Sequence, residues 1–250
     1  MTSGLVNVGP PIERLLADPR ERRTAAADIA SRVGMSIDLG LLQPRERLPR
    51  DEELATAFAV APITIRRALR QLCDEGILVR RRGRGGGTFV AAHPPRPPLL
   101  RYEAERARLS QEVWDLFDYR LVLEAGLIQL TVRSASDEDV AALRELVEAM
   151  AAAPDWAAFR PLDQSFHLAA AGIAASPRAL EELTTVLGRL ATLYFPHPVD
   201  YLHESNREHG EIVDAIAAGD VLTALAVVER HVTTAKDAFE WVRKATADHA

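Results

Sequence analysis

The chain has 250 residues, 48% of them hydrophobic, and a formal net charge of −6 at pH 7, which excludes a disordered chain and leaves room for one large or two modest domains. The charge is uneven: residues 1–92 hold 15 basic residues against 11 acidic ones, and residues 93–250 hold 15 against 25, which predicts a basic module followed by an acidic one. The single cysteine excludes an intramolecular disulfide, and the absence of a signal-peptide pattern or a bilayer-spanning apolar run favours a cytoplasmic protein.

The first part of the chain predicts short helices. Residues 1–23 carry no clear pattern and are expected to form a flexible segment. Apolar residues recur at helical spacing from about 24 to 37, and Gly40 ends that helix. A second helix is expected over 51–58, followed by a turn at 59–61. Two short helices separated by a tight turn are typical of a helix-turn-helix.

A third helix and two strands follow the turn. Pro62 suits the first helical position, where its missing N–H costs nothing, and Gly76 ends the helix. Residues 77–81 and 88–91 are expected to form strands around a glycine-rich tip. This order of elements predicts a winged helix-turn-helix, a fold that binds double-stranded DNA.

Arginines mark the surface of this unit that would meet DNA. When Ile65, Leu69 and Leu72 face inward, the arginines of the third helix remain outside. A guanidinium can donate two hydrogen bonds to guanine or phosphate, and a glycine-rich tip lets the backbone approach the minor groove. Any single arginine is as readily a solvated side chain, but the whole arrangement favours DNA contact. The predicted contacts are Thr64, Arg66, Arg67, Arg70, Arg82, Gly83 and Arg84.

These residues carry a resemblance to the GntR family of bacterial transcription regulators, over roughly residues 24–91. The matching positions are Leu48-Pro49, Glu53-Leu54-Ala55, Val60, Thr64-Ile65-Arg66-Arg67-Ala68-Leu69, Glu75-Gly76 and Thr88-Phe89-Val90. Two arginines that commonly contact DNA in the family are missing, because Glu52 and Ala61-Pro62 stand in their places. The resemblance therefore implies DNA binding with an altered operator preference, and Arg50 is expected to replace part of the lost charge.

Residues 93–100 predict a domain boundary. Four prolines in six positions cannot continue a helix or a sheet, so this segment is expected to be a stiff, extended spacer. It would join a winged-helix domain at 24–92 to a second domain at 101–250.

Amphipathic helices account for the second domain, and six or seven of them with short connections predict an antiparallel bundle. The expected protein is therefore mainly α, with three helices and a small β-wing joined to this bundle. The predicted helices run from Ser110 to Val132, from a capping box at Ser136 and Asp139 to Ala152, from Asp155 or Pro161 to Ala174, from Pro177 to Tyr194, from about Tyr201 to Ala217, and beyond Gly219-Asp220 to about Thr246.

Four side chains in this bundle form a candidate metal site. Asp163 and His167 are four residues apart and share one helix face, while His209 and His231 lie on two later helices. Carboxylate and neutral imidazole are ordinary ligands of Zn²⁺, Ni²⁺, Mn²⁺ and Fe²⁺. On spacing alone, a lone histidine in a helix is more often a hydrogen-bonded surface or core residue.

A second resemblance strengthens this hypothesis, because the C-terminal part is similar to the ligand-binding domain of the FadR subgroup of GntR regulators. The matching positions are Arg120 and Glu124, then Asp163, Phe166 and His167, then His209, Ile212, Ala215, Ile216, Gly219 and Asp220, and finally His231. The resemblance implies a divalent metal, zinc first, on Asp163, His167, His209 and His231. It also implies that Arg120 binds a carboxylate effector, although a structural ion pair with Glu124 explains Arg120 equally well.

The leading hypothesis is a DNA-binding regulator, a repressor, which binds a palindromic operator as a homodimer and responds to a small carboxylate near the metal. One alternative is a metal-dependent hydrolase or oxygenase. It lacks an evident general base, since Glu181, Glu204, Glu208 and Glu211 are candidates only by proximity in sequence. Another alternative is a regulator whose metal site is structural or empty. His197 and His203 receive no role.

Overall fold

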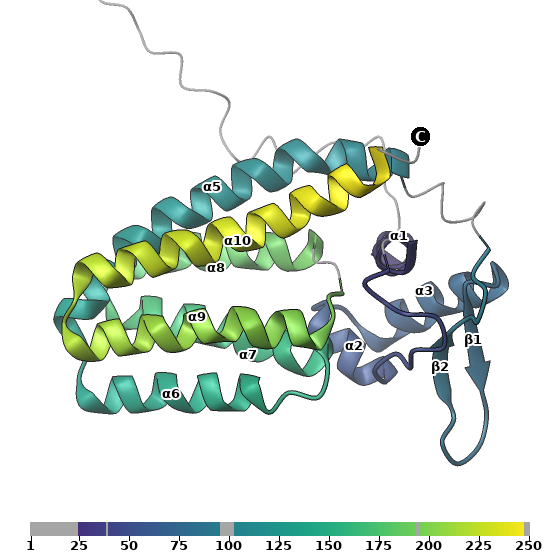
Figure 1. Cartoon of the computed structure of the whole chain (residues 1–250), viewed down its shortest axis with the longest axis horizontal. Coiled ribbons are helices and arrows are strands. Elements are labelled where there is room, and N and C mark those ends of the chain that lie inside the picture. Colours follow the sequence, from purple (N-terminus) through teal and green to yellow (C-terminus); the bar gives the residue numbers. More distant parts are fainter. Residues whose placement is uncertain (1–24, 39, 96–102, 194–195, 248–250) are drawn as a thin grey trace, which may run out of the picture.

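A computed structural model describes residues 25–38, 40–95, 103–193 and 196–247 of the chain. The expected flexible segment 1–23 and most of the expected spacer lie outside the described residues. The described part is mostly helical, with one small sheet, and the winged unit lies at one end of an elongated helical bundle (Figure 1). The expected fold class is confirmed.

The N-terminal unit is a winged helix-turn-helix. Strands β1 and β2 are antiparallel, with Leu78 opposite Val90. Its core is apolar and continuous, and it includes the inward face of the third helix. The elements are α1 (Ala25–Asp38), α2 (Asp51–Ala57), α3 (Pro62–Asp74), β1 (Leu78–Arg81) and β2 (Gly87–Val90).

The tip of the wing requires glycine. Gly83 and Gly85 have φ angles of 95° and 85°, in a region that residues with a Cβ rarely adopt. A Cβ on Gly86 would lie 2.5 Å from the Arg81 carbonyl oxygen. The turn can therefore be this tight only with this run of glycines, and it projects the arginines of the tip away from the domain.

Six helices form the C-terminal bundle, where α5 packs along α10 and α6 packs against both α7 and α9 (Figure 1). None of the helices described is long and apolar enough to cross a membrane. The helices are α5 (Glu103–Ser134), α6 (Asp137–Ala151), α7 (Trp156–Ile173), α8 (Pro177–Leu193), α9 (Val199–Ala218) and α10 (Val221–Ala247).

Local signals set most of the helix ends. Ser136 and Asp139 form the expected capping box at the start of α6. Asp155 caps α7 through two backbone N–H groups, so of the two expected starts the earlier one is correct and Pro161 lies inside the helix. The expected start of the first bundle helix at Ser110 is wrong, because α5 begins at Glu103. The residues before Ser110 are strong helix formers, so the helix begins seven residues earlier, at Glu103.

The two units meet through a stack of three side chains, Arg32, Phe58 and Trp156, which we call the interdomain stack. The ring of Phe58 lies edge-on to Trp156, with centroids 5.5 Å apart. The guanidinium of Arg32 lies 4.7 Å from the centroid of the Phe58 ring and donates to the carbonyl of Ala191 at the end of α8, at 3.4 Å. The stack therefore joins α1 and α2 of the winged unit to α7 and α8 of the bundle.

Candidate metal centre and DNA-binding surface

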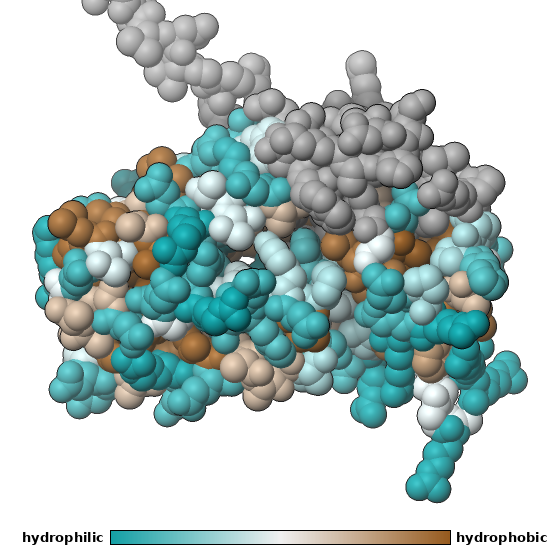
Figure 2. Space-filling view, in the orientation of Figure 1, coloured by the Kyte–Doolittle hydropathy of each residue, from teal (hydrophilic) through white to brown (hydrophobic). Residues whose placement is uncertain are grey.

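The arginines of α3 lie on the outer face of the winged unit. Ile65, Leu69 and Leu72 are buried, whereas Arg66, Arg67 and Arg70 are exposed, and Thr64 is half-buried near the start of the helix. The side chains at the wing tip, including Arg82 and Arg84, are exposed too. Hydrophilic side chains project from this end of the molecule (Figure 2). The surface is accessible and cationic, as contact with DNA requires.

Two further arginines, Arg80 and Arg81, make contacts at the base of the wing. Arg80 pairs with Asp51 at the start of α2, with Nη2 3.0 Å from Oδ1. The guanidinium of Arg81 lies 4.4 Å from the centroid of the Phe89 ring. These two side chains have partners within the domain, whereas Arg82 and Arg84 extend from the tip as exposed side chains.

Sequence reasoning missed Arg47. Its Nη2 donates to the carbonyl of Gly86 at 3.0 Å, and it forms an isolated β-bridge with Phe89. Together with Arg50 and Arg80 it lines a groove of about 310 Å³ between the wing and α2. No periodic pattern marks Arg47, because its place depends on a bridge to a strand some forty residues later in the chain.

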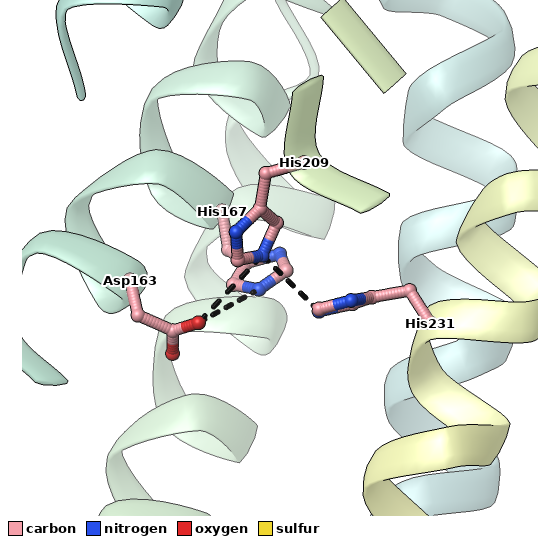
Figure 3. A group of neighbouring side chains, drawn as sticks. All are labelled: Asp163, His167, His209 and His231. Carbon is pink, nitrogen blue, oxygen red and sulfur yellow. Dashed lines mark hydrogen bonds and ion pairs between the residues drawn. The ribbon is translucent and has the colours of Figure 1, made fainter. Parts of the chain in front are cut away.

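The four predicted metal ligands lie together in the bundle. Asp163 and His167 come from α7, His209 from α9 and His231 from α10, and their side chains point toward one another (Figure 3). One ligand atom from each residue lies within 4.8 Å of all the others. The three imidazoles are nearly inaccessible to solvent, and His209 is 0% exposed. The geometry brings four ordinary metal ligands to one buried point.

The separations suit a small divalent ion. Two Nε2 atoms, of His209 and His231, lie 3.2 Å apart, and Oδ1 of Asp163 lies 3.6 Å from His209 Nε2 and 3.7 Å from His167 Nε2. Ligand atoms that share one zinc ion at about 2.1 Å lie about 3.0 to 3.4 Å apart. These three separations are close to that range, and all four ligand atoms lie within 4.8 Å of one another. No thiolate is present to select among metals.

Each imidazole is oriented by a second side chain, which sequence reasoning did not identify as a partner. The Nδ1 atom faces an oxygen acceptor in all three cases, so it carries the proton and leaves the Nε2 lone pair toward the centre of the cluster. The Nδ1–oxygen contacts are His167 to Glu124 at 3.1 Å, His209 to Asn206 at 3.1 Å, and His231 to Glu208 at 3.0 Å.

These orienting side chains are themselves fixed. The Nδ2 group of Asn206 donates to the Val147 carbonyl at 2.9 Å, which turns the amide oxygen toward His209. Glu208 accepts from Nε of Arg230 at 3.1 Å. In metal sites such outer partners hold the binding histidines in one tautomer, and the same kind of arrangement is present here.

The pKa shifts of His209, His231 and Asp163 favour the forms that bind a metal, whereas the shift of His167 favours protonation. Burial holds the pKa of His209 well below its usual range, and the neighbouring His231 and His167 lower it further. Burial also lowers the pKa of His231. For His167, burial opposes protonation, but the Glu124 carboxylate outweighs it and raises the pKa. Burial works to raise the pKa of Asp163, yet the hydrogen bond to His167 helps to hold it well below the usual range. Neutral imidazole and ionised carboxylate are the forms that bind a metal.

Arg120 lies at the edge of the cluster and forms the ion pair considered for it. Its Nε donates to Glu124 Oε1 at 2.6 Å, so the structural ion pair is present. Its Nη2 lies 2.8 Å from His167 Nε2, and the side chain also lines a neighbouring cavity. The ion pair thus does not remove Arg120 from the space where a ligand would bind.

A cavity of about 90 Å³ opens beside the cluster, and Asp163 and His231 form part of its wall. His197, Tyr201 and Ser205 also line it, as do several phenylalanine and leucine side chains. His197 stacks on Tyr201 with ring centroids 5.2 Å apart, and burial raises the pKa of Tyr201 to about 12, which keeps its hydroxyl protonated. The cavity thus has hydrogen-bonding groups and apolar walls, as ligand pockets usually do.

His197 and His203, which have no role in the sequence analysis, lie in different surroundings. His197 lines the cavity, whereas Nε2 of His203 contacts the Ala153 carbonyl at 3.1 Å. None of the glutamates considered as a general base is among the described residues that line the cavity. Three of them have partners: Glu204 pairs with Arg207, Glu208 with His231, and Glu211 with Arg230.

Comparison with known proteins identifies both halves. Residues 25–90 match the family described as bacterial regulatory proteins, gntR family, and residues 115–234 match the FCD domain. A candidate HTH-type transcriptional regulator of Mycobacterium gastri is 32% identical over 209 residues, which cover 82% of this chain and 76% of the relative. The chain belongs to the GntR family. It is a transcription regulator with a FadR-type C-terminal domain, as the sequence resemblance implied.

Two further relatives of this GntR regulator differ in how much of the chain they match. A candidate L-lactate dehydrogenase operon regulatory protein of Escherichia coli is 28% identical over 230 residues, or 84% of each chain. The histidine utilization repressor of Klebsiella aerogenes is 41% identical over 76 residues, or 29% of this chain and 31% of the relative. The likeness to the first spans both domains, and the likeness to the second is confined to a short segment.

Proposed function

We propose that this regulator is a repressor that binds a palindromic operator as a homodimer and releases it when a small carboxylate enters the cavity beside a divalent metal, zinc first among the candidates. The observation that carries the proposal is the convergence of three oriented Nε2 atoms and the Asp163 carboxylate next to the cavity. Four protein ligands leave a coordination position for an effector when the ion expands its shell. That a relative is named a repressor supports the sign of control.

The cavity favours a small anion as the effector. Its volume of about 90 Å³ suits a compact organic acid. Arg120 and Arg160 both line it. Each of these arginines is already balanced by one carboxylate, Glu124 and Asp163 respectively, so a bound divalent ion adds charge that an anionic ligand neutralises. A carboxylate is suited to this cavity because it can bind the ion and also accept hydrogen bonds from a guanidinium.

The interdomain stack offers a physical route from the cavity to DNA. Phe159 and Arg160 line the cavity from the first turns of α7, and Trp156 lies one turn before them against Phe58 of α2. A ligand that prefers one position of α7 would therefore bias the position of the helix pair that binds DNA. Allosteric control requires such a preference for one of two states.

The homodimer contact is proposed on the outer face of α5 and α10. Large apolar side chains are exposed there: Val122 by 68%, Leu130 by 41% and Leu222 by 79%. Apolar residues also gather at the end of the bundle farthest from the wing (Figure 2). Large exposed apolar side chains often mark a protein interface, and a two-fold dimer would match the symmetry of a palindromic operator.

Gel shifts with fragments of the organism's own genome test the DNA-binding surface. Replacing Arg66 with alanine is expected to weaken operator binding about 10- to 100-fold, because an exposed arginine of α3 loses its contacts to base or phosphate. Arg144→Ala, which removes an exposed arginine of the bundle paired with Asp214, serves as the control and should leave binding unchanged. Equal affinity of all three proteins at low salt would overturn the assignment of α3.

The response to effector is tested with the zinc-loaded protein and a panel of small mono- and dicarboxylates. One member of the panel is expected to weaken operator binding by about 5- to 150-fold, the usual range of allosteric coupling. The readout is the operator dissociation constant from gel shifts across a titration of each acid. A repressor released by effector is excluded if the active compound strengthens DNA binding instead.

A further inference from the structure

Arg120 forms a hydrogen bond with the same nitrogen of His167 that would bind a metal ion. Its guanidinium is buried and held at two points, by Nε to Glu124 at 2.6 Å and by Nη2 to His167 Nε2 at 2.8 Å. A guanidinium has only donors, so the Nε2 atom of His167 must be the acceptor. This agrees with its other nitrogen, Nδ1, donating to Glu124 at 3.1 Å.

The Nε2 atom of an imidazole has one lone pair. It can accept an N–H of Arg120 or bind a metal ion, and it cannot do both. The guanidinium is also electrostatically close to the rest of the cluster, since its positive charge contributes to lowering the pKa of both His209 and His231. Arg120 and a divalent cation therefore compete for the same atom and for the same small region.

Resting on the metal site assigned under the proposed function, we propose that Arg120 is a positioning residue that yields His167 to the metal and then presents its freed N–H groups to the effector in the cavity. Glu124 stays the pivot, because it contacts Nε of the arginine and Nδ1 of the histidine at once. The side chain already lines the cavity, so a rotation of the guanidinium about this pivot is enough. Metal binding and effector binding thus favour each other through one side chain.

The test measures Zn²⁺ affinity by competition with a chromophoric chelator for the full-length protein, Arg120→Gln and Arg120→Lys. Arg120→Gln is expected to bind Zn²⁺ roughly tenfold more tightly, because the charge and the hydrogen bond that oppose the metal are gone. Arg120→Lys, which keeps the charge, is expected to gain by a smaller factor. Lysine keeps the positive charge and the partner that buried Glu124 needs, so this variant also guards against a failure to fold. If Arg120→Lys binds Zn²⁺ like the wild type, or if neither variant binds more tightly, the competition is refuted.

A second probe, acetate titrated into the zinc-loaded proteins, separates positioning from simple support of the fold. Arg120→Gln is expected to bind acetate roughly tenfold more weakly while it binds Zn²⁺ more tightly, a change of opposite sign for the two ligands. Loss of affinity for both ligands would mean that Arg120 only maintains the structure, and would overturn the proposal. A wild-type protein that binds no Zn²⁺ at all would remove the metal site itself, and with it this inference.

Discussion

Replacing His209 with alanine is expected to reduce the zinc content of the purified regulator from about one ion per chain to nearly none. His209 lies at the centre of the cluster: its Nε2 atom is 3.2 Å from His231 Nε2 and 3.6 Å from the Asp163 carboxylate. Its removal leaves two imidazoles and one carboxylate around an enlarged space. Loss of even an outer partner of a metal-binding histidine typically costs 10- to 100-fold in affinity, and loss of the ligand costs more. Elemental analysis after gel filtration measures the change.

His203→Ala provides the matched control for this experiment. His203 lies on the same helix, but its Nε2 contacts the Ala153 carbonyl and takes no part in the cluster. This variant should therefore keep the zinc content of the wild type. Equal zinc in the wild type and His209→Ala would show that the ion binds elsewhere, and the assignment of all four ligands would then be wrong.

Most of the fold could be predicted because its signals are local. The capping box at Ser136 depends on residues three apart, and the end of α9 depends on the left-handed conformation of Gly219, with φ of 68°. The same reliance on a local signal makes the predicted start of α5 wrong. Serine is a good N-cap, but a helix begins earlier when the residues before the serine also favour a helix. Ser110 therefore lies inside α5.

The candidate site could be predicted less completely. Asp163 and His167 share a helix face by spacing, and the family resemblance supplied the other two ligands. Their orienting partners could not be found in this way, because the match of Glu124 to His167 depends on how α5 and α7 are rotated against each other. The interdomain stack was also beyond prediction: an apolar periodicity shows that Phe58 is buried, but does not show that its partner is Trp156.

Replacing Trp156 with alanine is expected to lower the free energy of unfolding by about 3–5 kcal/mol, because a large aromatic side chain that is 3% exposed leaves a cavity between α2 and α7. Chemical denaturation measures this loss. Trp114→Ala is the control, since Trp114 is only half-buried and contacts Lys236 on α10, away from the winged unit. The control should lose less stability.

Trp156→Ala also separates DNA binding from the response to effector. The arginines of α3 are exposed on the outer face of the winged unit, so operator affinity without effector should remain near that of the wild type. The weakening caused by effector should largely disappear in Trp156→Ala and persist in Trp114→Ala. The reason is that α7 carries both the cavity wall and Trp156, and Phe58 receives its movement at the end of α2. A full effector response in Trp156→Ala would mean that the contact of Arg32 with Ala191 at the end of α8 is sufficient to couple the two domains.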